Sequence, residues 1–250
     1  MIVAMMATLA TLTFASRRLE MIRENVEQGR CCSPSEVEAI AALGGPMAET
    51  YGEITLDGMK ALANRVMMGP SDIFADLGSG CGRAVFQALT DFDVASTCGI
   101  ELAESRHELA LQSLAALPAE QASRVRLLCG DCAAADAWQP GGALADATIV
   151  YVASLCFGDE LMQRLGARLE ESARVRTVAT LKPFAGGLGG GFVAVDPPEA
   201  CEMSWTALRP NEHGDGDTTQ PVYLYARYTD SFDLRTLVGD WALGSDHTLL

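Results

Sequence analysis

The sequence predicts an α/β protein with a mostly parallel, doubly wound sheet, an antiparallel strand pair at one sheet edge, and N-terminal helices. From residue 73 onward, short apolar runs alternate with helical patterns, which is typical of βαβ units. The last two apolar runs have no helix between them, and a glycine-rich turn follows the first run. With 49% hydrophobic and 20% charged residues in 250, the composition indicates one globular core with an appendage.

Two helices are expected before the first strand. The earlier one starts at Pro34, because Ser33 is an N-cap residue and Glu36 completes a capping box, and it stops at 44–46. The later one is expected over 58–68. Its apolar face consists of Met59, Leu62, Val66 and Met67.

The first 16 residues carry no charge and are followed by Arg17 and Arg18. A secretory signal has its positive charge before the apolar run, and a membrane span takes about 20 apolar residues. Apolar residues continue at helical spacing through the charged stretch, which favours an amphipathic helix packed on the body. An organelle transit peptide is the alternative, since no acidic residue precedes Glu20.

The remaining elements follow from the alternation of apolar runs and helical patterns. Parallel strands are expected at 73–77, 96–102, 124–128, 147–152 and 175–181. Helices are expected between them at 83–89, 104–117 and 159–169. The antiparallel edge pair is expected at 201–205 and 222–228, joined by the polar loop 208–220.

The charge balance restricts the partners. The chain has 18 basic and 33 acidic residues, a formal net charge of −15, and Lys60 and Lys182 are its only lysines. Neutralising nucleic-acid phosphates needs clustered Lys and Arg, so little direct nucleic-acid binding is expected. A basic protein partner is electrostatically favoured, and no membrane partner is expected.

Most of the eight cysteines stand in apolar strings and are expected to be small buried side chains in a reducing, intracellular compartment. Cys129 and Cys132 form a lone CxxC. Because no second CxxC or histidine pair completes four zinc ligands, a metal or redox role is the less favoured alternative. No metal is expected.

The most informative string is DLGSGCG at 76–82, after the first expected strand and at the start of a helix. Glycines there let the backbone turn sharply and approach a ligand closely. A dinucleotide fingerprint would place a third glycine at position 83, where Arg83 stands. Asp76 would repel a pyrophosphate, so this turn favours a cationic ligand.

Two further acidic residues stand at the ends of the next strands. Glu101 lies about 20 residues beyond the glycines, where an acidic side chain accepts hydrogen bonds from ribose hydroxyls, and Asp131 follows the third strand. With Asp76 they predict a site for a ribose-bearing, positively charged cofactor, and S-adenosylmethionine has both properties. The alternative is that each acid is a solvated loop residue.

Eight short strings extend this pattern: YGEIT (51–55), DLGSGCGRAVFQ (76–87), GIE (99–101), GD (130–131), YVASLCFG (151–158), LKPF (181–184), SWT (204–206) and PVYLY (221–225). On these strings the chain resembles the Dot-one family, non-SET methyltransferases that act on a lysine in the globular core of a histone. The resemblance covers about residues 49–228. It implies the Rossmann-like seven-strand methyltransferase fold.

The resemblance also implies roles for single residues. The YGEIT loop would close over the methionine part of the cofactor, Glu101 would bind ribose, and adenine would lie beside residues 131–132. Cofactor binding is expected from Tyr51, Gly52, Glu53, Thr55, Asp76, Gly78, Gly80, Glu101, Asp131 and Cys132. A lysine channel, and so catalysis, is expected from Ser154, Phe157, Trp205 and Tyr225.

Methyl transfer to an amine requires in-line approach and a neutral nucleophile. Because a free lysine has a pKa of about 10.4, the site must desolvate and deprotonate it, which an apolar aromatic channel favours. Ordinary packing is the alternative for the channel aromatics. Ala153 and Ser154 stand where well-known members of the family have asparagines, which leaves the substrate preference open.

The sequence therefore predicts an S-adenosylmethionine-dependent lysine methyltransferase acting on a basic protein, with histone as first candidate. The alternatives are a small-molecule methyltransferase and a non-catalytic binding module. This sequence does not show the family's long Lys-rich segment, so a nucleosome substrate is expected to need a separate anchoring subunit or a different docking mode. The expected segments are 1–48 (helical), 49–230 (methyltransferase domain) and 231–250 (tail). A nuclear location is expected if the substrate is a histone, and a cytoplasmic one otherwise.

Overall fold

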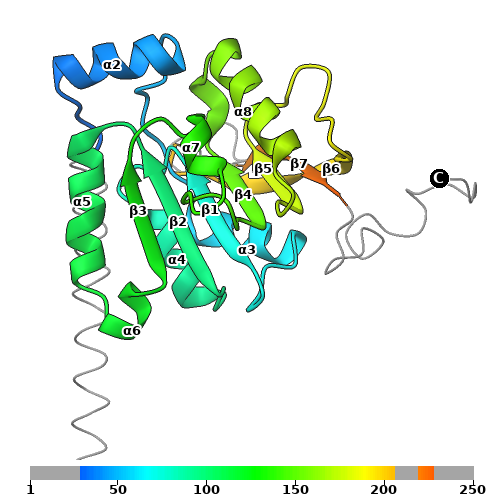
Figure 1. The fold of residues 1–250 in the computed structure, drawn as a ribbon, viewed down its shortest axis with the longest axis horizontal. Helices are drawn as coiled ribbons and strands as arrows, with labels where there is room; N and C mark the ends of the chain where they lie inside the picture. The colour runs from blue at the N-terminus through cyan, green and yellow to red at the C-terminus, as the bar shows by residue number, and fades with distance from the viewer. Residues whose placement is uncertain (1–28, 206–218, 228–250) are drawn as a thin grey trace, which may run out of the picture.

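Seven strands form one sheet in the computed structural model, which describes residues 29–205 and 219–227 (Figure 1). In chain order the elements are α2 (Pro34–Gly44), α3 (Leu56–Arg65), β1 (Ile73–Leu77), α4 (Arg83–Asp91), β2 (Ser96–Glu101), α5 (Glu104–Ala115), α6 (Ala119–Ala122), β3 (Val125–Cys129), α7 (Ala135–Trp138), β4 (Ile149–Val152), η1 (Ser154–Cys156), α8 (Asp159–Glu171), β5 (Thr177–Thr180), β6 (Val193–Glu202) and β7 (Thr219–Ala226).

The strand order is β3-β2-β1-β4-β5-β7-β6. Strands β1 to β5 are parallel, whereas β7 runs antiparallel to both β5 and β6. The order of the strands reverses between β1 and β4, so the carboxyl ends of these two strands border a topological switch point, where sheets of this kind bind ligands. The predicted doubly wound sheet with an antiparallel edge pair is confirmed.

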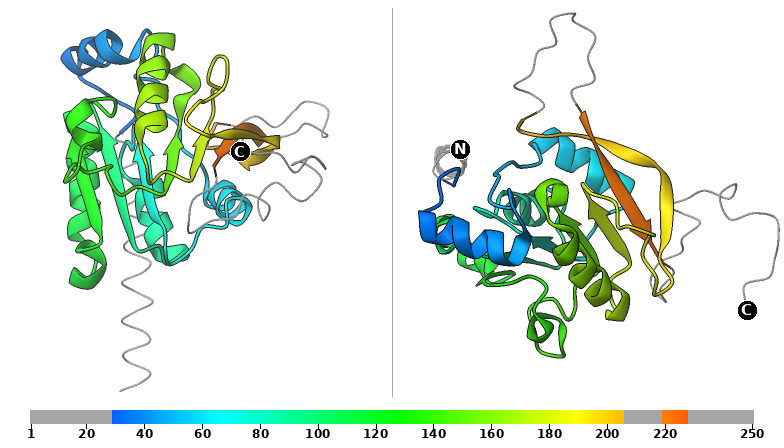
Figure 2. Two further views of the ribbon diagram at one scale, coloured as in Figure 1. Left: turned by 45° about the vertical axis from the view of Figure 1, so that its right-hand side comes forward. Right: turned by 90° about the horizontal axis from the view of Figure 1, so that it is seen from above.

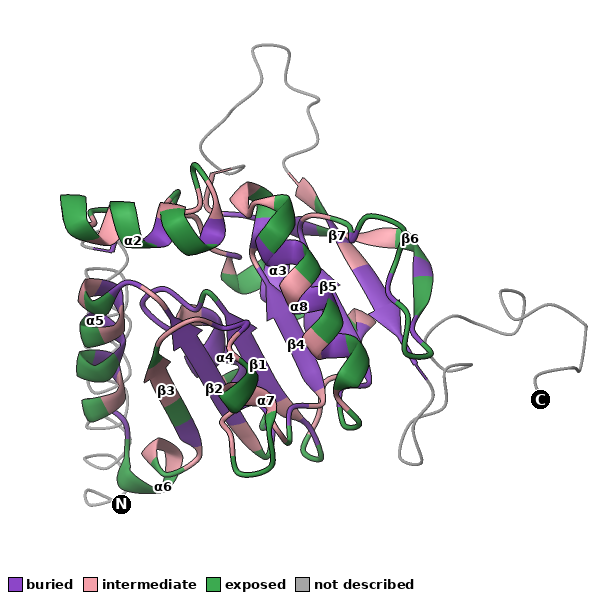
Figure 3. Ribbon diagram, turned by 45° about the horizontal axis from the view of Figure 1, so that its top comes forward, coloured by how far each residue is buried: buried purple, intermediate pink, exposed green. Residues whose placement is uncertain are grey.

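Helices cover both faces of the sheet (Figure 2). On one face α4 packs against β1 and β2, and α3 packs against β6, with Leu62 and Phe74 in the shared apolar cluster. On the other face α8 packs against β4 and β5, with Leu165 and Val150 in the shared cluster. The inner strands β1, β4 and β5 are consequently buried almost throughout (Figure 3). Helix α2 lies across the carboxyl end of the sheet (Figure 1).

The predicted helix starts agree with the structure to within two residues. Ser33 caps α2 and forms the expected capping box with Glu36. Helix α3 begins at Leu56 rather than at 58, because the Thr55 side chain accepts a hydrogen bond from the backbone N–H of Gly58. Its predicted apolar face is buried except at Met67, which lies beyond the helix end with a positive φ.

The last two strands both begin earlier than predicted, and β7 starts at Thr219 rather than at 222. Strand β6 spans Val193–Glu202, whereas a strand was expected at 201–205. Pro197 and Pro198 interrupt the apolar pattern and lack N–H donors, but an edge strand accommodates them at the irregularity in its pairing with β7. Met203 instead forms an isolated antiparallel bridge with Ile54.

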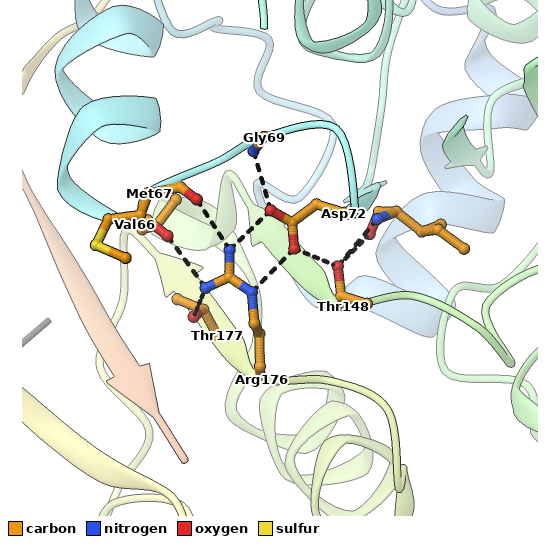
Figure 4. A network of polar contacts seen from close by, with 8 residues as sticks. Val66, Met67, Gly69, Asp72, Thr148, Arg176 and Thr177 are labelled. Atoms are coloured by element: carbon orange, nitrogen blue, oxygen red, sulfur yellow. Dashed lines mark hydrogen bonds and ion pairs between the residues drawn. The ribbon is translucent and has the colours of Figure 1, made fainter. Parts of the chain in front are cut away.

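At the opposite end of the sheet from α2, a buried ion pair links β1 to β5 (Figure 4). Both nitrogens Nε and Nη2 of Arg176 donate to the carboxylate of Asp72, at 2.9 and 2.8 Å. Arg176 also donates to the carbonyls of Val66 and Met67, and Thr148 donates to Asp72. Because every charged atom has a partner, this network fixes the chain entering β1 against β4 and β5.

The cysteines are less uniformly buried than expected. Cys81, Cys98, Cys132 and Cys201 are buried, but Cys129 of the CxxC pair is exposed. Among the described residues, no group of three or more His, Cys, Asp or Glu is placed to hold a metal ion, and no helix is long and apolar enough to cross a membrane. The predicted N-terminal amphipathic helix, most of the loop 208–220 and the tail 231–250 lie outside the described residues.

Candidate active site

A cavity opens at the carboxyl ends of β1, β2 and β4 and holds about 930 Å³ of space that protein does not fill, part of it open to solvent. One side is formed by the turn after β1 and by the residues that follow β2 and β3. The other side is formed by the C-terminal half of α2 and the segment 48–54. The cavity therefore lies at the switch point of the sheet.

The turn after β1 depends on its glycines. Gly78, Gly80 and Gly82 have φ values of +82°, +54° and +83°, which L-residues with a Cβ rarely adopt. A Cβ on Gly80 would lie 2.7 Å from the Tyr51 ring, and one on Gly78 would lie 3.2 Å from Phe157. Glycine thus allows both the turn and the close approach of two aromatic rings that line the cavity.

Glu101, at the end of β2, holds this turn in place through a hydrogen bond with its backbone. Its Oε2 accepts a hydrogen bond from the Gly80 N–H at 2.7 Å, and its Oε1 accepts one from the Ala103 N–H at 2.8 Å. Each carboxylate oxygen has a second lone pair. The buried Glu101 side chain therefore holds the glycine turn and retains acceptor capacity toward the cavity.

Asp76 lies at the end of β1 with 4% of its surface exposed, and its Oδ1 has no hydrogen-bond partner. Burial raises the pKa of Asp76 well above its usual value, and the nearby carboxylates of Glu101 and Glu53 raise it further. A buried, unpartnered carboxylate oxygen is costly. A cationic ligand in the cavity would satisfy it.

The YGEIT loop contributes a polar chain of its own. The Tyr51 hydroxyl donates to Glu53 Oε1 at 2.5 Å, and Arg83 Nη1 lies 3.2 Å from Glu53 Oε2. Burial raises the pKa of Glu53, against the opposing effects of the Tyr51 hydrogen bond and of Arg83. From α5, the Arg106 guanidinium lies 4.8 Å from the centre of the Tyr51 ring and donates to the carbonyl of Glu49 at 2.6 Å.

Residues 202–205 hold the same loop from its outer side. The Glu53 N–H donates to Ser204 Oγ at 3.1 Å, and the Ser204 N–H donates back to the Glu53 carbonyl at 2.8 Å. The Trp205 ring covers Gly52 so closely that a Cβ there would lie 2.3 Å from Cε3. The YGEIT loop therefore forms one structural unit with Ser204 and Trp205 beside the cavity, although Glu53 and Ser204 are 151 positions apart in the sequence.

Asp131 and Cys132 lie at the end of the cavity formed after β3. Asp131 Oδ1 accepts from the Ala133 N–H at 2.9 Å, and Oδ2 accepts from Arg164 of α8 at 2.6 Å. Burial raises the pKa of the Cys132 thiol to about 12, so it lines the cavity as a neutral, weakly polar group. Arg164 also donates to the Leu43 carbonyl, which connects α8 to α2 above this end.

The structure brings most of the predicted site residues together around the cavity. The predicted residues that line it are Tyr51, Gly52, Glu53, Asp76, Gly78, Gly80, Glu101, Asp131, Cys132 and Phe157. The other four lie outside the lining: Thr55, Ser154, Trp205 and Tyr225. Thr55 caps α3, and Trp205 supports the loop as described above.

Ser154 and Tyr225 make internal contacts instead. The Ser154 hydroxyl lies 2.6 Å from Thr180 Oγ1 and accepts from the Lys182 N–H at 3.0 Å. The Tyr225 hydroxyl accepts from the Phe184 N–H at 3.1 Å, in the apolar cluster on the α8 face. Both residues therefore hold the chain that leaves β5. The register of β7 places Tyr225 on the opposite face of the sheet from Asp76, which is why it does not reach the cavity.

No sequence pattern distinguishes two residues that line the cavity, Arg106 and Tyr151. Arg106 on α5 has the pattern of a solvated helix residue, but contacts with Gly29, Glu49 and Tyr51 bury it. Tyr151 on β4 looks like an ordinary core aromatic and yet lines the cavity. Their positions are the available signal, because Tyr151 stands on a strand that ends at the carboxyl edge of the sheet and Arg106 on a helix that begins there.

The sheet order with its reversed β7, the glycine turn after β1 and the acids at the carboxyl ends of β1, β2 and β3 define a class I, Rossmann-like methyltransferase fold. Residues 38–187 match the family described as histone methylation protein DOT1. The chain belongs to this family.

A curated protein is similar to part of the chain. Over 62 residues the chain is 37% identical to a histone-lysine N-methyltransferase, H3 lysine-79 specific, of Candida albicans. This match covers 25% of the chain and 5% of that protein.

Solved structures show a more distant likeness. An RNA methyltransferase from Salinibacter ruber in complex with S-adenosyl-L-homocysteine is 22% identical, with a TM-score of 0.41 over 68% of this chain and 86% of that one. A putative RNA methyltransferase from Pyrococcus horikoshii is 14% identical, with a TM-score of 0.45 over 68% of this chain and 82% of that one.

Proposed function

We propose that this protein is an S-adenosylmethionine-dependent methyltransferase that acts on a lysine of a basic protein, with a histone as the first candidate. The observation that carries the proposal is the set of three carboxylates, Asp76, Glu101 and Asp131, around one cavity at the switch point of the sheet. Membership of the DOT1 family supports it, and so does the activity named for the Candida albicans relative.

The residues present suit this cofactor. It contains an ammonium and a sulfonium, and the cavity offers the unpartnered Oδ1 of Asp76. It contains a ribose diol, and Glu101 has lone pairs left to accept from hydroxyl groups. When bound, the cofactor supplies an electrophilic methyl group on sulfur, and the thioether that leaves needs no proton.

We assign the cofactor's parts to the residues of this chain as follows. The loop 51–55 and Asp76 would hold the methionine end, Glu101 the ribose, and Asp131 with Cys132 the adenine. Thr55 acts through the loop that it anchors: its hydroxyl donates to the carbonyl of Glu202 at 3.2 Å.

The substrate amine must lose its proton before transfer, because an ammonium has no lone pair. Phe157 and Ala153 line the cavity without a formal charge, and an apolar wall disfavours the ammonium form. We therefore keep Phe157 in the lysine channel. Ser154 and Tyr225 are proposed to support that wall through the chain after β5, and Trp205 through the loop 51–55.

The proposed substrate class agrees with the charge of the protein. A net charge of −15 attracts a Lys-rich polypeptide and repels nucleic acid. A nuclear location follows from the histone assignment and belongs to the same proposal.

The decisive experiment is incubation with radiolabelled S-adenosylmethionine and, in parallel, separated histones, nucleosomes, cell lysate and small amines. Label on a histone, removed by Asp76→Asn, supports the proposal. Label on small amines alone would replace it by a small-molecule methyltransferase. Tight cofactor binding with no transfer to any acceptor would replace it by a non-catalytic binding module.

A further inference from the structure

In the described part of the chain, six buried side-chain polar atoms have no hydrogen-bond partner, and two of them belong to residues that line the cavity. These two are Oδ1 of Asp76 and the hydroxyl of Tyr151. Asp76 is accounted for by a cationic ligand. Tyr151 has no role in the site described so far.

The two atoms come from neighbouring positions of the sheet. Asp76 of β1 and Tyr151 of β4 are paired in register, so their side chains leave the same face of the sheet on strands about 4.8 Å apart. The Tyr151 side chain is 2% exposed and packs in the cluster that contains Ile54 and Met203. Its ring therefore lies beneath the loop 51–55, and its hydroxyl is held in place by packing alone.

The other polar groups nearby already have at least one hydrogen-bond partner. Glu101 accepts from two backbone N–H groups, Glu53 pairs with Tyr51 and Arg83, and the Ser154 hydroxyl is bonded to the chain after β5. A buried hydroxyl without a partner is unfavourable, so an unpartnered pair on a cavity wall indicates a ligand group that satisfies both atoms.

We propose that Tyr151 is a cofactor-positioning residue, whose hydroxyl accepts a hydrogen bond from the α-ammonium of the cofactor beside Asp76. This inference rests on the proposed function. An ammonium has three N–H donors. Two of them would donate to Asp76 and Tyr151 on this wall, and the third would point toward the loop 51–55. The pair recognises the amino-acid end of the cofactor and makes no contact with its nucleoside.

The test compares two ligands on the full chain by calorimetry. S-adenosylhomocysteine carries the α-ammonium, whereas 5′-methylthioadenosine keeps adenine, ribose and sulfur but lacks the amino-acid part. Tyr151→Phe is expected to weaken S-adenosylhomocysteine about tenfold or more and to change 5′-methylthioadenosine less than twofold, because one hydrogen bond to a charged group is lost. Thr97→Val, which removes another unpartnered buried hydroxyl outside the cavity lining, is the matched control and is expected to change neither affinity.

Each other result overturns the inference. Unchanged affinity of Tyr151→Phe for S-adenosylhomocysteine excludes the contact, and lower turnover at unchanged affinity would assign the hydroxyl to the substrate amine instead. Equal weakening of both ligands would show a role in shaping the cavity only. Failure of the unaltered protein to bind S-adenosylhomocysteine would instead reject the proposed function, so the two failures are distinguishable.

Discussion

Glu101 combines two tasks in one side chain, because it holds the glycine turn and faces the proposed ribose site. We expect Glu101→Ala to weaken S-adenosylmethionine at least tenfold, since hydrogen bonds to a charged acceptor contribute about 1.5 to 3 kcal/mol each. Calorimetry with the folded variant measures this.

Glu101→Gln separates the two tasks. The amide oxygen can still accept from one backbone N–H, so the turn is better preserved while the charge is lost. Unchanged cofactor affinity in both variants, with native circular dichroism, would remove Glu101 from the site.

Asp76, the proposed partner of the cofactor's cation, is expected to reduce the stability of the fold. Its folded-state pKa is raised, so the folded protein holds this proton more tightly than the unfolded chain does. The free energy of unfolding therefore decreases as pH rises from about 3.9, the unfolded value, through the raised folded value. We expect Asp76→Asn to increase the melting temperature at neutral pH while weakening the cofactor at least tenfold.

The raised pKa of Asp76 also predicts how cofactor binding depends on pH. A bound cation favours ionised Asp76, so cofactor affinity is expected to rise with pH until the pKa of the free protein is passed, and then to level off. Calorimetry at several pH values checks this. An affinity that falls over the same range would argue against a cation beside Asp76.

At the scale of elements, the loop 51–55 is the part that the rest of the chain holds in place. Trp205→Ala removes the ring that covers Gly52 and is expected to lower turnover and, because the loop borders the cavity, also to weaken cofactor binding. The melting temperature is also expected to fall. Because Trp205 is only partly buried, the loss of stability should be smaller than the roughly 3 to 5 kcal/mol that truncating a fully buried aromatic costs. A variant with native affinity, turnover and melting temperature would exclude any role in holding the loop.

The link between β1 and β5 gives a prediction that concerns stability alone. Asp72→Ala leaves the Arg176 guanidinium buried without its carboxylate, which is expected to cost about 3 to 5 kcal/mol. Affinity for the cofactor should be unchanged when the variant is folded, since neither residue lines the cavity. Asp57→Ala breaks the exposed pair with Lys60 and is the control, with no measurable effect on unfolding expected.

For the whole molecule, the charge is the property with the clearest consequence. With 18 basic against 33 acidic residues, the isolated protein is expected to bind naked DNA very weakly at about 0.15 M salt, because few counterions are released. A gel-shift assay measures this. Submicromolar binding would contradict the prediction and would favour direct docking on nucleosomal DNA.

The sequence by itself determined the parallel part of the sheet and the glycine turn. Apolar runs of strand length between helical patterns predict buried parallel strands, and a GxGxG string after the first run predicts a ligand turn, because both are local patterns. The carboxylates of Asp76, Glu101 and Asp131 were also predictable, since the carboxyl ends of parallel strands meet at one edge.

Tertiary structure alone decided the edge strands and the walls of the cavity. Pro197 and Pro198 made β6 look unlike a strand, because proline lacks the N–H that a central strand needs. An edge strand tolerates the missing N–H, but the sequence does not reveal which strand is at the edge. Tyr225 and Tyr151 both stand on strands. The pairing register places Tyr225 in the apolar cluster beside α8 and Tyr151 on the wall of the cavity. A side chain's face depends on which strand lies beside it, and that pairing is a long-range property that no local pattern records.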